Sequence, residues 1–204
     1  MTRVFLLRHG QTEWNAVGRL QGSTDIPLNE TGQEQAIAAA RALAALVAPD
    51  TMIVASPLSR ARETAQSLAA AVGVSVATDA RLAERSYGVW EGMTDAERVS
   101  HAPDEVVRWR QGDEPAIDGY EGHAPLGARV MAALHEHAAR AKGDLVLVSH
   151  GGALRMAVTV ALGLHLADSS QRAAIRGLDN AHWSQLKYRG PGDWMLVAHN
   201  VGPN

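Results

Sequence analysis

The chain has 204 residues, of which 46% are hydrophobic and 20% are charged, and its formal net charge is −3. These values are typical of one soluble globular domain that is large enough to bury a substantial core. A negative chain lacks the broad basic surface that nucleic acid requires, so nucleic acid is excluded as the main partner, whereas a small anion can bind in a local pocket.

The absence of cysteine excludes a disulfide framework and a thiolate metal site, and it agrees with a reducing compartment. The N-terminal apolar run is short and indicates a strand rather than a signal peptide. The apolar stretches are too short and too interrupted to span a membrane. We therefore expect a cytoplasmic protein that has no membrane anchor.

Strands and helices alternate along the chain. Strand composition is found at residues 4–7, 52–55, 74–77, 145–149, 182–188 and 194–199. Helical spacing of apolar residues is found at residues 31–48, 58–72, 126–141 and 152–163. This alternation predicts a single α/β domain over residues 1–204, built as a three-layer α/β/α sandwich with a mostly parallel central sheet.

Residues 85–125 interrupt this alternation. The segment is rich in Gly, Pro and charged residues and holds two of the five tryptophans. It is too long for an ordinary connection and too aromatic for a disordered linker. We interpret it as an excursion that walls or lids a pocket. A short helical hairpin that packs at the edge of the core is the alternative.

Two predicted strands end in a histidine that is followed by glycine. Arg8 and His9 follow the strand at 4–7, and His150 follows the strand at 145–149. The glycine after His9 lets the backbone approach a ligand closely. The carboxyl ends of parallel strands share one sheet edge, where ligands bind in open α/β folds. The pattern predicts an anion site, which the N–H groups of the helix after His150 would reinforce.

Two further side chains belong to the same edge. Arg60 lies in the first turn of the helix at 58–72, and its guanidinium suits phosphate oxygens. Glu84 follows the third predicted strand. A lone strand-end histidine is more often structural. Paired histidines can also bind metal, but the arginines would repel a cation and no Asp or Cys joins them. Convergence from four strand ends therefore favours a metal-free anion site.

These residues lie in blocks that resemble the histidine phosphatase superfamily, in its phosphoglycerate mutase-like branch. The segments LLRHGQTEWNAVGRLQG and DIPLNETGQEQA are similar to its N-terminal signature. The segments SPLSRARETA, LAERSYGVWEG and LVLVSHGG match its later blocks in the same order. The resemblance covers nearly the whole chain and is weakest over residues 93–122. It implies the phosphoglycerate mutase-like fold and chemistry on a phosphoryl group.

The resemblance also implies a catalytic pair. His9 would be the nucleophile, which attacks phosphorus through a neutral imidazole nitrogen and forms a phosphohistidine. Glu84 would protonate the leaving alkoxide and then activate the hydrolytic water. Glu91, seven residues further on, is interpreted as structural. A phosphatase of this kind needs no metal or organic cofactor, whereas a mutase needs priming by a bisphosphorylated activator.

Binding residues follow from the same resemblance. The groups expected to bind the phosphoryl oxygens and the transition-state charge are Arg8, Arg60, His150, Asn15, Gln21 and the Gly151 N–H. Tyr87, Trp90 and Trp109 are candidates for aromatic walls around a sugar ring. Packing within the segment 85–125 is the alternative for these aromatic residues.

Two departures from the mutase pattern favour a phosphatase. Asp95 stands where those mutases carry a lysine for the substrate carboxylate, and Arg110 is followed by Gln111 where they carry paired arginines. Little chain follows the last predicted strand, so we expect no tail that excludes water from the site. The segment GYEGHAP also departs from the family's usual GGES and keeps Glu121 but not the serine.

We therefore expect an enzyme that hydrolyses small phosphomonoesters such as sugar phosphates or phosphoglycerate-type metabolites. The combination of GRLQG and LDNAHWSQLKY resembles actinobacterial phosphatases of sugar phosphates and glucosyl-3-phosphoglycerate. α-Ribazole phosphate and phosphoserine are also open as substrates. A phosphoglycerate mutase, a protein phosphatase and a non-catalytic phospho-ligand binding module are the alternatives. A homodimer through a sheet edge or a helix is open as well.

Overall fold

The computed structural model describes residues 1–203, which form one six-stranded sheet in the order β3-β2-β4-β1-β5-β6. The strands are β1 (Thr2–Arg8), β2 (Met52–Ala55), β3 (Val76–Thr78), β4 (Leu145–Ser149), β5 (Trp183–Gly190) and β6 (Asp193–Val201). The first four strands pair in parallel, whereas β5 and β6 are antiparallel. The predicted α/β class with a mostly parallel sheet is confirmed.

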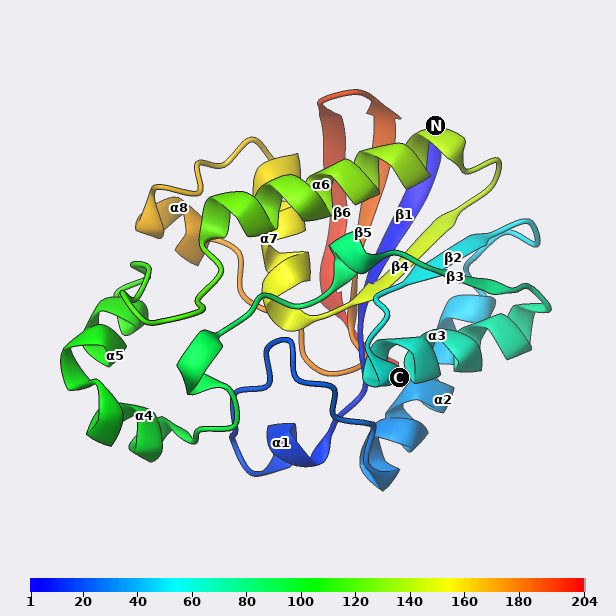
Figure 1. Ribbon diagram of the computed structural model, residues 1–204. Coiled ribbons are helices and arrows are strands. Elements are labelled where there is room, and N and C mark those ends of the chain that lie inside the picture. The colour runs from blue at the N-terminus through cyan, green and yellow to red at the C-terminus, as the bar shows by residue number, and fades with distance from the viewer. Residues whose placement is uncertain (204) are drawn as a thin grey trace.

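Helices cover both faces of this sheet (Figure 1). The α-helices are α1 (Glu13–Ala16), α2 (Glu30–Ala44), α3 (Ser59–Val72), α4 (Asp95–His101), α5 (Pro103–Arg110), α6 (His123–Arg140), α7 (Gly151–Ala161) and α8 (Ser169–Ala173). Two short 3₁₀ helices are η1 (Ala80–Leu82) and η2 (Gly88–Trp90). The helices α2 and α3 pack on one face and α6 and α7 on the other, so the layers are those of the predicted sandwich.

The central strand β1 shows why the sequence forms these layers. Successive side chains of a strand point to opposite faces of the sheet. Val4 and Leu6 accordingly pack in the cluster that contains α6 and α7, whereas Phe5 and Leu7 pack in the cluster that contains α2 and α3. A strand that is buried on both faces needs a continuous apolar run, and VFLL supplies it.

The predicted strand at 74–77 is shorter and later than expected. The helix before it ends at Gly73, which adopts φ 74°, and the N–H groups of Gly73 and Val74 both donate to the Ala69 carbonyl. These bonds complete the end of α3, so the extended backbone begins only at Val76. The helices α1 and α8 were not predicted, because one turn is too short to show a helical period.

The segment 85–125 contains η2, α4 and α5, which extend beyond the sheet at the left of Figure 1. Trp90 is fully buried inside this segment, with its ring 5.8 Å from the ring of Trp109. The guanidinium carbon of Arg98 lies over the same Trp109 ring, 5.3 Å from its centroid. Of the two interpretations of Trp90, packing within the segment 85–125 is the one that the structure supports, since the indole is buried in the core of the excursion.

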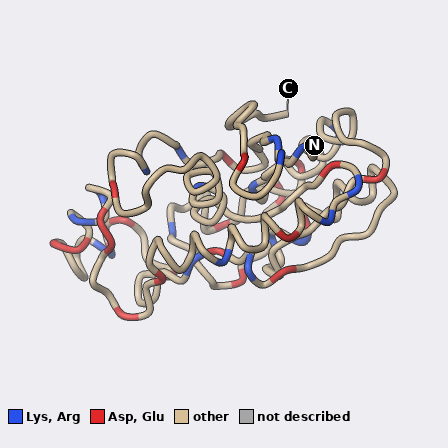
Figure 2. The backbone as a smooth tube through the Cα atoms, turned by 90° about the horizontal axis from the view of Figure 1, so that it is seen from above, with Lys and Arg blue, Asp and Glu red and all other residues tan. Residues whose placement is uncertain are grey.

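Charges of both signs are interspersed along the backbone, as Figure 2 shows for Lys and Arg against Asp and Glu. Several of them form surface pairs, such as Glu136 with Arg81 and Arg140. Exposed pairs of this kind contribute little to stability, about 0–1 kcal/mol each. Among residues 1–203, none of the helices combines the length and the hydropathy needed to cross a bilayer.

The close packing of residue 10 against α2 requires glycine. A Cβ at this position would lie 2.3 Å from the carbonyl oxygen of Gly32 in α2, which is a backbone atom. We expect Gly10→Ala to lower the free energy of unfolding by about 1–3 kcal/mol, because the backbone of β1 or α2 must move. Urea unfolding measures the difference. The control is Gly177→Ala, whose added Cβ would meet nothing within 4 Å; equal midpoints for the two variants would contradict the prediction.

Candidate active site

The pairing of β1 with β4 brings the two strand-end histidines together. Arg8 lies opposite Ser149 in the parallel register, and the His9 N–H donates to the Ser149 carbonyl at 3.0 Å. The imidazole rings of His9 and His150 are therefore neighbours, with centroids 5.1 Å apart. The second strand reaches the same edge, because the Ser56 N–H donates to the Val148 carbonyl at 2.9 Å.

A cavity of about 190 Å³ opens at this edge, and we call it the His9 cavity. Of the predicted site residues, those that line it are Arg8, His9, Asn15, Gln21, Arg60, Glu84, Tyr87 and Gly151. The exception is His150, which is buried and is not among the residues that line this cavity. Within residues 1–203, no group of three or more His, Asp or Glu side chains is arranged to hold a metal ion.

His9 presents an unprotonated nitrogen to this cavity. Its Nδ1 lies 2.7 Å from the Gly10 carbonyl oxygen. Because a carbonyl only accepts hydrogen bonds, Nδ1 carries the proton and Nε2 keeps its lone pair. Burial lowers the pKa of His9 well below its ordinary value, and the charges of Arg8 and Arg60 lower it further. The imidazole is therefore neutral and nucleophilic at neutral pH.

The two cavity arginines are held by neutral groups. Arg8 donates through Nη1 to the Leu178 carbonyl at 2.6 Å, and its buried Nε has no hydrogen-bond partner within the described chain. Arg60 is fully buried and donates from Nη1 and Nη2 to the carbonyls of Thr24 and Gly22, each at 2.8 Å. Because carbonyls do not neutralise a guanidinium, both positive charges stay available to an anion.

His150 lies directly behind Arg60. Its Nδ1 accepts a hydrogen bond from Arg60 Nε at 3.2 Å, and its Nε2 lies 2.7 Å from Ser56 Oγ. Since arginine is always a donor, Nδ1 is unprotonated and the Nε2–H donates to the serine. Both ring nitrogens are thus engaged inside the protein, and direct contact of His150 with a phosphoryl group stays a prediction.

Glu84 is fixed at the first turn of α7. Its carboxylate accepts hydrogen bonds from three backbone N–H groups: those of Gly152 at 2.8 Å, Ala153 at 3.0 Å and Arg85 at 2.8 Å. The free N–H groups of a helix N-terminus favour a negative charge. A Cβ at Gly152 would lie 2.7 Å from Glu84 Oε1, so this approach needs glycine. The carboxylate therefore occupies a defined place on the cavity wall.

The two predicted amide side chains also line the His9 cavity. Asn15 Oδ1 accepts from the Thr12 N–H at 3.1 Å and from Asn180 Nδ2 at 3.3 Å. With its oxygen engaged in this way, the amide nitrogen of Asn15 is the group left to donate into the cavity. Gln21 is nearly buried, and its Oε1 has no hydrogen-bond partner within residues 1–203.

Sequence reasoning missed the loop before β5. The His9 carbonyl accepts from Asn180 Nδ2 at 3.0 Å and from the Ala181 N–H at 3.1 Å. Ala181 adopts φ 57°, a conformation that costs a non-glycine residue energy and persists only where the surroundings impose it. No local sequence signal indicates this contact, because it follows from the antiparallel pairing of β5 with β1, which places Trp183 opposite Leu7 and the residues before β5 at the end of β1.

Glu91 joins two loops that border the cavity. Its carboxylate accepts hydrogen bonds from the N–H and hydroxyl groups of Ser23 and Thr24 and from the Tyr87 N–H at 3.0 Å. Burial alone would raise the pKa of Glu91, but these hydrogen bonds lower it below its ordinary value. The contacts agree with the structural interpretation of this residue. They also hold the loop whose carbonyls bind Arg60.

Comparison with known proteins identifies the family to which this chain belongs. The chain belongs to the histidine phosphatase superfamily, branch 1, whose family model matches residues 4–202. The family that the sequence motifs resemble is therefore confirmed.

Some relatives of this chain are named as phosphatases and others as probable phosphoglycerate mutases. A glucosyl-3-phosphoglycerate phosphatase of Mycolicibacterium vanbaalenii is 38% identical over 192 residues, which cover 90% of this chain and 83% of that protein. A probable phosphoglycerate mutase of Citrobacter koseri is 38% identical over 204 residues, covering 96% and 91%. The structure of mycobacterial glucosyl-3-phosphoglycerate phosphatase with VO3 superposes with a TM-score of 0.88 at 33% identity, covering 99% and 100%.

The role of Glu91 can be tested by anion binding. Glu91→Gln keeps the size of the side chain but replaces one accepting oxygen with a donor, which loosens the loop that holds Arg60. We expect inorganic phosphate to bind about tenfold more weakly, equivalent to about 1.4 kcal/mol. Isothermal calorimetry measures this affinity. The exposed Glu34→Gln is the charge-matched control, and equal affinities in the two variants would show that Glu91 does not position the site.

Proposed function

We propose that this protein is a metal-independent phosphatase of small phosphomonoesters that works through a phosphohistidine at His9. The observation that carries the proposal is the arrangement of the His9 cavity. A neutral imidazole with a free Nε2 lies beside Arg8 and Arg60, neither of which forms a salt bridge within residues 1–203. A phosphoryl dianion is complementary to this charge, and its phosphorus would lie within reach of Nε2.

In the first half-reaction, His9 Nε2 attacks phosphorus, the N–P bond forms and the bond to the ester oxygen breaks. Glu84 enters this step protonated and gives its proton to the leaving alkoxide, so that a neutral alcohol departs and a carboxylate remains. Arg8 and Arg60 bind the equatorial oxygens, on which charge accumulates in the transition state. The amide of Asn15 and the Gly151 N–H, which line the same cavity, add hydrogen bonds.

In the second half-reaction, the Glu84 carboxylate takes a proton from water, whose oxygen attacks phosphorus as the N–P bond breaks. Inorganic phosphate leaves, and His9 returns to its neutral form with Nδ1 still bonded to the Gly10 carbonyl. Glu84 suits both steps, because the helix N–H groups hold it at one place on the wall throughout. His150 supports the chemistry through Arg60, whose Nε it accepts.

The relatives include named phosphatases and probable mutases, and the structure favours the phosphatase. Asp95, at the position of the mutase lysine, pairs with Arg98 at 3.0 Å and with Arg110 at 2.5 Å. The charge of Arg110 is thereby neutralised, and Gln111 adds none. The mutase set of cations for a substrate carboxylate is therefore absent from these positions.

Among substrates, a phosphorylated sugar acid of the glucosyl-3-phosphoglycerate type is the candidate that the relatives support. Phosphoserine is a second candidate, because the phosphoserine phosphatase of Entamoeba histolytica superposes with a TM-score of 0.81 at 26% identity. Action on a small metabolite agrees with the predicted cytoplasmic location.

The catalytic pair is tested by substitution. We expect His9→Ala to abolish turnover of p-nitrophenyl phosphate, because the nucleophile is lost. Glu84→Gln should slow turnover by about 10²–10⁴-fold and allow a phosphorylated protein to accumulate, since proton transfer contributes that much. Intact-protein mass spectrometry at neutral pH detects the added phosphoryl group. The exposed His101→Asn serves as control, and full activity of His9→Ala would disprove the mechanism.

The reaction class is tested with a panel of esters in the presence of EDTA. The panel holds p-nitrophenyl phosphate, sugar phosphates, glucosyl-3-phosphoglycerate, phosphoserine and 3-phosphoglycerate, with released phosphate and isomerised product both measured. We expect phosphate release without added metal, because two arginines supply the charge that a metal would otherwise provide. Isomerisation of 3-phosphoglycerate that outpaces phosphate release would identify a mutase instead.

A further inference from the structure

One loop holds both Arg8 and His9 from outside β1. Residues 174–182 connect α8 to β5, and we call them the β5 loop. The Leu178 carbonyl of this loop accepts a hydrogen bond from Arg8 Nη1 at 2.6 Å, and its Asn180 side chain donates to the His9 carbonyl at 3.0 Å. Leu178 also lines the His9 cavity. The position of the β5 loop therefore bears directly on the nucleophile and on one phosphoryl-binding arginine.

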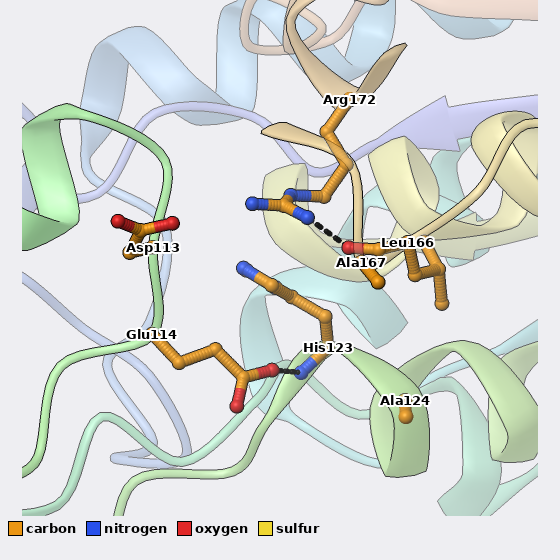
Figure 3. Close-up of a pocket in the computed structure, with 7 residues that line it drawn as sticks. All are labelled: Asp113, Glu114, His123, Ala124, Leu166, Ala167 and Arg172. Atoms are coloured by element: carbon orange, nitrogen blue, oxygen red, sulfur yellow. Dashed lines mark hydrogen bonds between the residues drawn. The ribbon is translucent and has the colours of Figure 1, made fainter. Parts of the chain in front are cut away.

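The start of the β5 loop is anchored by arginines of α7 and α8. Arg172, in α8, is 4% exposed and donates to the Leu166 carbonyl, as Figure 3 shows. Arg155, in α7, donates to the carbonyls of Arg172 at 2.7 Å and Ile175 at 2.8 Å. These contacts end before the part of the loop that holds the catalytic edge.

The last strand, β6, carries a β-bulge beside this part of the loop. The pairing of β5 with β6 shifts by one residue between Trp183 and Gln185, so that His199 and Asn200 both lie opposite Ser184. Asn200 adopts φ 55°, a left-handed conformation that asparagine tolerates better than most residues. A bulge of this kind bends its strand and re-aims its side chains, and bulges are common next to active sites.

Asn200 forms a reciprocal contact with Asp179 of the β5 loop. Its Oδ1 accepts a hydrogen bond from the Asp179 backbone N–H, and its Nδ2 donates to Asp179 Oδ2, each at 2.8 Å. The bond from Asn200 is the main cause that lowers the pKa of Asp179 below its ordinary value. Asp179 lies between Leu178 and Asn180 in the chain, so the contact fixes the backbone between the two groups that hold Arg8 and His9.

His199 forms a second contact between the bulge and the β5 loop. Its Nε2 lies 3.0 Å from the Arg176 carbonyl oxygen, and its Nδ1 lies 2.8 Å from Oγ of the buried Ser184. Because a carbonyl only accepts hydrogen bonds, Nε2 carries the proton and the serine hydroxyl donates to Nδ1. The bulge thus holds the loop on both sides of Leu178, at residues 176 and 179.

We propose that Asn200 and His199 are positioning residues for the phosphatase reaction, which act on Arg8 and His9 through the β5 loop. This inference rests on the proposed function and adds the end of β6 to its machinery. Neither residue of the bulge lines the His9 cavity, so each acts by holding the loop. A loop that shifts would carry the Leu178 carbonyl with it, and the Arg8 guanidinium would no longer be aligned with the phosphoryl oxygens.

Binding of inorganic phosphate to Asn200→Gly protein tests this role. Glycine accepts the left-handed backbone, so the variant removes the side chain without straining the bulge. We expect Kd to rise about fivefold or more, because the hydrogen bonds that hold the loop are lost. Isothermal calorimetry measures Kd, which does not depend on the fraction of folded protein. The control is Asp193→Gly at the other end of β6, which removes an exposed pair with Arg189 and should leave Kd unchanged.

An exchange of the two side chains tests the contact itself. Asn200→Asp alone sets a second carboxylate against Asp179 and should also weaken phosphate binding. The double variant Asp179→Asn/Asn200→Asp restores a carboxylate–amide pair with the roles reversed, and it keeps the net charge of the chain. We expect its Kd to return to within about twofold of the wild-type value, so that the two substitutions are far from additive.

The possible failures are distinguishable. Equal Kd values in wild-type and Asn200→Gly protein disprove the positioning role, and a fall in the unfolding midpoint alone would show that the contact is only structural. A double variant that binds phosphate as weakly as Asn200→Asp also disproves it. If wild-type protein binds phosphate but hydrolyses no ester, the phosphatase function fails and the Kd values still decide the role of the bulge. If wild-type protein does not bind phosphate, both proposals are wrong.

Discussion

The parallel pairing of β1 with β4 is the constraint on which the rest of the site depends. It places Arg8 opposite Ser149, so that the residues following these two positions emerge side by side. His9 and His150 then share an edge with Ser56 at the end of β2. Because hydrogen bonds between strands fix the register, a shift by one residue would move these side chains to the wrong faces of the sheet. The rigidity of the catalytic edge thus comes from the core.

The arginines in and near the His9 cavity are held in place by neutral hydrogen-bond acceptors. Arg8 and Arg60 in the His9 cavity, and Arg85, Arg155 and Arg172 beyond it, all donate to carbonyls, hydroxyls or imidazoles. Such contacts orient a guanidinium without cancelling its charge. Burial is the main cause that lowers the pKa of His9, and the charges of Arg8 and Arg60 lower it further. The two arginines that would attract an anion thus also help to keep the imidazole neutral.

The excursion between residues 85 and 125 connects these two regions. Its own core, centred on the buried Trp90, holds Tyr87 and Trp109 in position. Glu91 ties its start to the loop that carries the carbonyl partners of Arg60. The segment thus lines the His9 cavity through Tyr87 and supports the loop that holds Arg60. The segment forms short helices, as one interpretation predicted, and its Tyr87 lines the His9 cavity, as the pocket-wall interpretation predicted.

The sequence by itself determined the α/β sandwich and several residues that line the candidate site. The apolar runs that end in RHG and SHGG predict buried strands with Arg8, His9 and His150 at their ends, and the segment LAERSYGVWEG adds Glu84. Only the tertiary structure decided that Trp90 is core, that His150 lies behind Arg60, and that Asn180 and Ala181 hold the His9 carbonyl. It also decided that Arg85 and Arg155 face one cavity. These outcomes depend on contacts between residues far apart in the chain, which no local pattern of side chains encodes.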